Sequence, residues 1–255
     1  MSELPQSCLL RLERAREHLD TFEAEARTFL DSQPYKRVIK KHGQSVPEAY
    51  PDPPPRLALI ISDYLHELRS CLDSLVFHLA GCPDDRECRL QFPIFSKERG
   101  YVEHEERYLN GVCDDAKAVI KGLQPYNRPD NWEFPFPYRP ERVLLVRLHD
   151  LNRVDKHRTL HLMVRSVVSV GMWSAEPGFS LDVFGPQKDD ASLQRLADEM
   201  NVDVMPMFGV SFEDRWPTEG INHAGFYLRL ILRHVSERVL PQFDRFFKSG
   251  VRIAP

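Results

Sequence analysis

Long apolar runs are missing from this sequence of 255 residues. No segment approaches the roughly 18 uninterrupted apolar residues that a membrane-spanning helix needs. The first five residues contain no apolar core of a signal peptide, and they pass directly into a charged, helix-like segment. We therefore expect a cytoplasmic protein with no membrane partner.

Cysteine is scarce, and its spacing suggests no pairing. The five cysteines are an odd number with no close pair, which argues against a disulfide framework. Cys82 and Cys88 are separated by five residues, whereas common zinc-binding pairs are separated by roughly two to four. We expect the cysteines to be buried or unreactive thiols.

A strong excess of either charge is also missing, as are the glycine motifs of common catalytic sites. The formal net charge of −4 does not favour nucleic acid or an anionic membrane as a partner. The densest basic patch, at residues 36–42, is typical of a solvated strand or loop. The sequence has no Gly-x-Gly-x-x-Gly, phosphate loop, Gly-x-Ser-x-Gly or His-Glu-x-x-His motif. We expect no cofactor.

Four long segments do carry apolar residues at helical spacing. They span residues 8–32, 56–80, 140–158 and 224–247, and an apolar residue recurs in each at every third or fourth position. Because each apolar stripe must be buried against a partner, these segments predict a helical bundle. Pro241 should bend the last helix.

Shorter segments with valine-rich or alternating patterns follow the third of these helices. Residues 163–173, 179–183 and 208–212 read as strands of a small antiparallel sheet within 160–212. A polar helix is expected at 191–200. The predicted fold class is α+β, mainly α: a helical bundle flanked by a small antiparallel sheet.

Three polar residues lie along one border of the helix predicted at 56–80, namely His66, Arg69 and Asp73. Arg69 and Asp73 are four residues apart, so they should form an ion pair within the helix. A solvated helix face, worth a few tenths of a kcal/mol, explains this border as well as a functional site does.

Asp155 lies at the centre of the apolar stripe of the helix predicted at 140–158. A carboxylate in such a position needs a cation or several donors, because burying it alone is costly. We predict that Asp155 contacts Arg69 or Arg158, and that Asn152 adds a neutral donor and acceptor on the same face. A structural polar lock between two helices accounts for Asp155 almost as well as a catalytic site does.

Two histidines are candidates for a catalytic base. His66 shares a helix border with Arg69, whereas His157 points away from Asp155 unless the helix ends or distorts nearby. A metal site is a further alternative and would be built from His66, Asp73, His149 and Asp155. Because the two histidines of this set do not show the i, i+4 spacing of helical metal sites, we predict no metal.

Three segments resemble a group of uncharacterised bacterial proteins: residues 65–79, 123–126 and 148–158. In that group a helix with an Arg-Ser-x-Leu-Asp-His core precedes an Asn-x-x-Asp-Lys-His-Arg segment. The first segment is also similar to the signature of HEPN domains, which are helical bundles. Many HEPN domains are metal-independent ribonucleases of toxin–antitoxin and phage-defence systems, and others only bind RNA or nucleotides.

The HEPN signature is an arginine followed, after four to six residues, by a histidine. Arg69 matches the arginine, but Ser74 stands at the fifth position after it, and the next histidine, His78, follows nine residues after Arg69. The resemblance implies that Arg69 holds a phosphate and that His66 or His157 replaces the missing base.

The resemblance implies a single HEPN-like domain over residues 1–255, with a C-terminal sheet and helix, that binds RNA or cleaves it without a metal in a bacterial stress or defence system. The implied site divides into the catalytic candidates Arg69, His66 and His157 and the binding candidates Asp73, Asn152, Asp155 and Arg158. The alternative is a non-catalytic binding or scaffold protein whose Arg/Asp/His cluster is a structural polar lock. RNA, a second copy of the chain or a partner protein remain open as partners.

Overall fold

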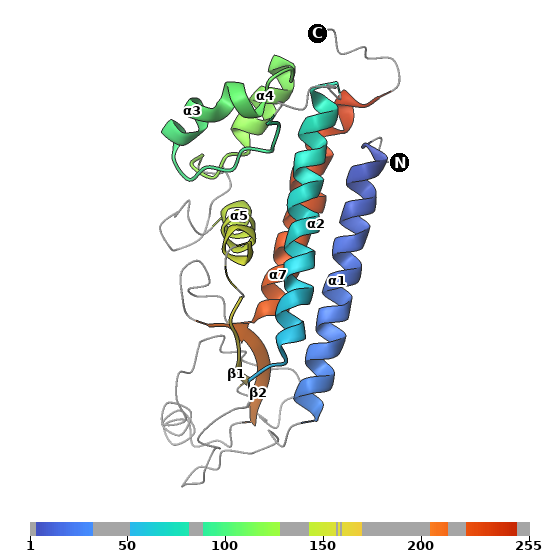
Figure 1. Cartoon of the computed structure of the whole chain (residues 1–255), viewed down its shortest axis with the longest axis vertical. Coiled ribbons are helices and arrows are strands. Elements are labelled where there is room, and N and C mark those ends of the chain that lie inside the picture. Colours follow the sequence, from blue (N-terminus) through green and yellow to red (C-terminus); the bar gives the residue numbers. More distant parts are fainter. Residues whose placement is uncertain are drawn as a thin grey trace, which may run out of the picture. The chain divides into compact units, whose positions relative to one another are not determined.

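The fold within the described part of the chain is α+β and mainly α, which confirms the predicted class (Figure 1). The computed structural model describes residues 4–32, 52–81, 89–127, 143–156, 158, 160–169, 205–213 and 223–248. The strand predicted at 179–183, the helix predicted at 191–200 and the candidate base His157 lie outside these residues.

Three helices carry the long apolar stripes. α1 spans Gln6–Asp31, α2 spans Pro55–Leu79 and α7 spans Ala224–His234. α2 begins at a proline, whose fixed φ suits the first helical position and whose missing N–H is no loss there. The stripe of α2 is no more than 1% exposed at Leu57, Ile61, Leu65, Leu68, Leu72 and Leu75.

The last helical stretch changes its form as it approaches Pro241. After α7, Val235–Val239 form a π-helical turn and Leu240–Phe246 form a 3-10 helix. A proline inside an α-helix removes one backbone donor and crowds the carbonyl four residues earlier, so the α-helical hydrogen bonds cannot continue unchanged. The interruption expected at Pro241 takes this form.

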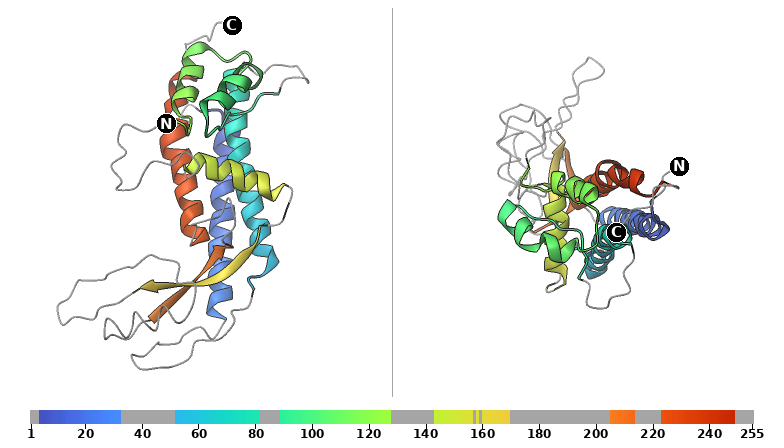
Figure 2. Two further views of the ribbon diagram at one scale, coloured as in Figure 1. Left: turned by 90° about the vertical axis from the view of Figure 1, so that its left-hand side faces the viewer. Right: turned by 90° about the horizontal axis from the view of Figure 1, so that it is seen from above.

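Three shorter helices follow α2. α3 spans Glu98–Tyr108, α4 spans Asp114–Gly122 and α5 spans Leu144–Asp155. Gly111, between α3 and α4, has a φ of 78°, a left-handed conformation that favours glycine. α5 crosses the direction of α2 instead of running beside it (Figure 2). Crossed helices meet over a short stretch, so only a limited part of α5 can contact α2.

The chain divides into two compact units, and the boundary falls within α1, α2 and α7. Unit 1 comprises Met1–Leu19, Ile61–Arg158 and Leu228–Pro255, and unit 2 comprises Asp20–Ile60 and Thr159–Tyr227. The single-domain organisation over residues 1–255 therefore stays a prediction.

Unit 2 contains the sheet. β1 (Leu162–Ser169) and β2 (Met205–Phe212) pair antiparallel, with Leu162 opposite Phe212. Val164 and Val210 face each other across the two strands, and both are buried. This confirms the expectation of a small antiparallel sheet in this part of the chain. Among the described helices, none is both long and apolar enough to cross a membrane.

Candidate functional site

Arg69 and Asp73 form the ion pair that their spacing on α2 predicts. Nη2 of Arg69 lies 2.8 Å from Oδ1 of Asp73. Arg69 is only 6% exposed, whereas a third of the Asp73 side chain, 33%, is accessible to solvent. The pair is therefore buried on the arginine side and reaches solvent only through the carboxylate.

The backbone of Phe92 completes this pair. Nη2 of Arg69 donates a hydrogen bond to the Phe92 carbonyl oxygen at 2.6 Å, and the Phe92 N–H donates to Oδ1 of Asp73 at 2.9 Å. Phe92 is fully buried, and its ring lies edge-on to that of Phe243. Buried peptide groups need hydrogen-bond partners, and this loop finds both of them on α2.

Burial and charge act in opposite directions on Asp73. Burial raises the pKa of this carboxyl group, while the Arg69 charge and the Phe92 N–H lower it. The net shift is upward, so desolvation outweighs the pairing. Nη1 of Arg69 is buried too, and within the described part of the chain it has no hydrogen-bond partner.

Asp155 has a different partner from the one predicted. Oγ of Ser62 donates a hydrogen bond to its Oδ2, and no ion pair among the described residues joins Asp155 to Arg69 or Arg158. The prediction is wrong because Ser62 lies seven residues before Arg69 on α2, which is roughly 10 Å along the helix axis. Nη2 of Arg69 is already engaged by Asp73 and Phe92.

The other predicted site residues do not gather around Arg69. His66 is exposed, and its Nε2 lies 3.4 Å from Oγ of Ser70. Asn152 is buried at 5% exposure, whereas Arg158 is exposed. The described contacts therefore bring together Arg69 and Asp73 but place neither His66 nor Arg158 with them.

His78, the histidine that follows Arg69 outside the expected HEPN spacing, belongs to a separate cluster. Its Nε2 lies 3.0 Å from Oγ of Ser7, and that hydroxyl lies 2.7 Å from Oγ of Ser74. Ser74, at the position where the signature has histidine, thus joins α2 to the first turn of α1.

Two neighbouring residues of α5, His149 and Asp150, are charged or titratable side chains that are largely buried, which their sequence pattern does not indicate. Burial lowers the pKa of His149 to about 4, helped by the charges of Arg69, Arg153 and Lys156. Asp150 is only 8% exposed, and its Oδ1 lies 3.4 Å from Nη2 of Arg153. The sequence indicates His149 only as a ligand of the metal alternative and Asp150 in no role, because neither belongs to a periodic polar pattern.

The residues of the metal alternative do not converge either. Within the described ranges, no three histidine, cysteine, aspartate or glutamate side chains gather closely enough to hold a metal ion.

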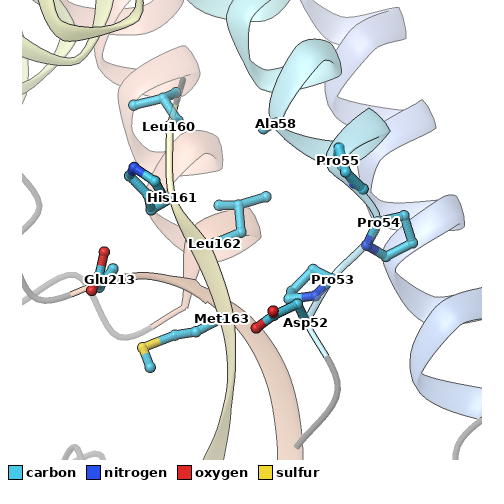
Figure 3. A pocket seen from close by; sticks show the side chains of 10 residues that line it. All are labelled: Asp52, Pro53, Pro54, Pro55, Ala58, Leu160, His161, Leu162, Met163 and Glu213. Atoms are coloured by element: carbon cyan, nitrogen blue, oxygen red, sulfur yellow. The ribbon is translucent and has the colours of Figure 1, made fainter. Parts of the chain in front are cut away.

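Unit 2 contains a pocket of about 350 Å³. Pro53–Pro55 lie on one side of β1, and His161 and Glu213 lie on the other (Figure 3). Leu162 and Met163 add apolar surface, and Asp52 adds a second carboxylate. This mixed lining favours no single ligand class, and it includes none of the predicted site residues.

Comparison with known proteins gives one partial similarity. No family model and no solved structure matches the chain. A stretch of 57 residues is 42% identical to the E3 ubiquitin-protein ligase RNF114 of Homo sapiens and of Pan troglodytes, covering 22% of this chain and 25% of each relative. The Mus musculus protein is also 42% identical over 57 residues. The chain thus spans about a quarter of the length of the curated relatives it matches, a local similarity that shows no family.

Proposed function

We propose that this chain is a non-catalytic binding or scaffold protein in which Arg69 and Asp73 form a structural polar lock. The observation that carries the proposal is the double use of Phe92, whose carbonyl oxygen and N–H are both bound by these side chains. The charged pair therefore has a structural role, because it anchors a buried loop to α2.

The same contacts disfavour a phosphate at Arg69. An incoming phosphate would have to compete with the Asp73 carboxylate and the Phe92 carbonyl for a guanidinium that is 6% exposed. The adjacent carboxylate would also repel it, because like charges destabilise each other at short range.

Among the described residues, neither His66 nor His78 is in place beside Arg69 as a catalytic base. Such a base should lie within about 2.6–3.2 Å of the proton it removes, or reach it through one water. His66 is exposed and contacts Ser70, and His78 contacts Ser7. These positions support binding without turnover.

A second candidate function is RNA binding, or metal-independent RNA cleavage, in a bacterial stress or defence system. The exposed cations Arg153 and Lys156 near His149 favour it, because cations that neutralise phosphates supply most of the affinity for nucleic acid. The low pKa of His149 keeps its ring neutral near neutral pH but makes it a weak base, so these cations favour RNA binding more than cleavage.

One experiment separates the two functions. Purified protein is mixed with labelled single-stranded RNA at low salt in EDTA, and fluorescence anisotropy and gel analysis report binding and cleavage. We expect intact RNA. Fragments ending in a cyclic phosphate, absent with a folded Arg69→Lys variant, would overturn the structural lock and support the ribonuclease.

Variants that each remove one positive charge test whether the protein binds RNA. Lys156→Ala and Arg153→Ala each remove one cation near His149, and Arg99→Ala removes one from a side chain that is 89% exposed on α3. RNA binding that weakens in the first two variants but not in the third, and that falls steeply with salt, would support RNA as the ligand. Equal binding by all three variants would count against it.

A further inference from the structure

Two buried cysteines face each other between α1 and α2 in unit 1. Sγ of Cys8 lies 3.6 Å from the carbonyl oxygen of Cys71, and Sγ of Cys71 lies 3.3 Å from the carbonyl oxygen of Cys8. Both are free thiols with 0% exposure. Because each sulfur reaches the backbone of the other residue, the two helices approach closely here, as a disulfide requires.

The two thiols are chemically unequal. The hydrogen bond with Cys71 lowers the pKa of Cys8 most, and the hydroxyls of Ser74 and Ser7 and the charge of Arg11 lower it further, against the effect of burial. The pKa of Cys71 is raised by its hydrogen bond with Cys8 and by burial. Cys8 is thus the better nucleophile, since the thiolate is the reactive form.

The position of Cys8 gives it a route to solvent. It is the third residue of α1, in the first turn, and its N–H donates to the Pro5 carbonyl oxygen just before the helix at 2.9 Å. Helix ends open locally at a lower free energy than the core. The half-buried hydroxyls of Ser7 and Ser74 lie beside it and contact each other at 2.7 Å. Opening of this turn would expose the Cys8 sulfur without unfolding α2.

We propose that Cys8 and Cys71 form a reversible redox site that closes into an intramolecular disulfide, with hydrogen peroxide as the oxidant. The Cys8 thiolate attacks one peroxide oxygen and the O–O bond breaks. The products are a sulfenic acid on Cys8 and one water, which takes up the proton released by the Cys8 thiol. The sulfur of Cys71 then attacks the Cys8 sulfur and displaces hydroxide, which leaves as a second water with the Cys71 proton.

The overall reaction converts two thiols and one peroxide into one disulfide and two waters. The new bond links residues 63 positions apart in the sequence and ties the first turn of α1 to α2. Such a link restricts the unfolded chain, so the oxidised protein should be more resistant to unfolding.

The test uses a variant in which the other three cysteines, Cys82, Cys88 and Cys113, are changed to serine. The folded variant is treated with hydrogen peroxide, its free thiols are alkylated, and its peptides are mapped by mass spectrometry. We expect a Cys8–Cys71 crosslink that dithiothreitol reverses. We also expect the melting temperature to rise by about 5 °C on oxidation.

Single substitutions in the same background assign the roles. Cys8→Ser should abolish the crosslink and leave Cys71 unmodified, whereas Cys71→Ser should leave a sulfenic acid on Cys8 that dimedone traps. Peptide mapping of the unsubstituted chain should show the same crosslink, and it does not depend on any variant folding. The proposal would be overturned if, in the folded unsubstituted chain, Cys8 and Cys71 both remained free under conditions that oxidise Cys113.

Discussion

The peptide N–H of Phe92 donates to the carboxylate of Asp73 at 2.9 Å, across 19 residues of sequence. The loop that contains Phe92 needs an acceptor for this N–H, and the half-buried Asp73 carboxylate supplies it. Arg69, one turn earlier on α2, supplies the matching donor to the Phe92 carbonyl. The energetic consequences of this arrangement can be measured.

Arg69→Ala should lower the free energy of unfolding by about 3 kcal/mol, because it leaves the Asp73 carboxylate and the Phe92 carbonyl without their cation. Urea denaturation followed by circular dichroism measures this change. The matched control is Arg233→Ala. Its ion pair with Glu237 is equally short at 2.8 Å, but the Arg233 side chain is 73% exposed.

The control should leave stability almost unchanged, since exposed ion pairs contribute little. Equal losses in the two variants would show that Arg69 is not part of a buried lock.

Acidification should destabilise the protein through His149. Its pKa in the folded state is about 4, below the ordinary value of 6.5, so between these values the unfolded chain binds more protons. Stability therefore falls as the pH drops from 6.5 towards 4. From neutral pH to about pH 5 the loss should be about 2 kcal/mol.

The variant His149→Gln isolates this effect, because it removes the titrating ring but leaves Asp73 and Asp150 in place. Urea titrations of both proteins at the two pH values give the comparison. An identical loss of stability in the wild type and in His149→Gln would assign the acid sensitivity to other groups.

Ser62→Ala should weaken the connection between α2 and the end of α5 by about 1–2 kcal/mol, because Asp155 loses its hydroxyl donor. Ser70→Ala is the control on the same helix. Its hydroxyl contacts the exposed His66 at 3.4 Å and should contribute almost nothing to stability. Thermal melting of the two variants checks the difference, and a larger effect for Ser70→Ala would contradict it.

Two glycines should respond to alanine in opposite directions. Gly111 has a φ of 78°, so Gly111→Ala should cost about 1–2 kcal/mol of backbone strain. Gly122 ends α4, and a Cβ there meets no heavy atom within 4 Å. Gly122→Ala should be neutral or stabilising by about 0.5 kcal/mol. Destabilisation by both would argue against the left-handed turn at Gly111.

The periodic features of this chain could be predicted because they depend on local geometry. The apolar stripe of α2 and the four-residue spacing of Arg69 and Asp73 follow from the helical repeat alone, and both are confirmed. The spacing of Asp155 indicated that it faces inward but not which level of α2 it meets. Because α5 crosses α2, that level is set by tertiary packing, and the partner is Ser62.

Other features of the site could not be predicted from a single sequence. Every residue except proline has the same N–H and carbonyl groups, so nothing marked the backbone of Phe92 as the partner of Asp73. The low pKa of His149 depends on burial and on cations from two helices. Such a property is known only once the helices are packed.

The two hydrogen bonds that hold Phe92 also set how quickly its amide proton can exchange with deuterium. Amides in loops usually exchange fast, but this one is donated to a side chain on α2 and lies in a fully buried residue. Its proton is released only when α2 and the loop separate. Phe92 should therefore exchange as slowly as the amides of the α2 core, as part of the same cooperative unit.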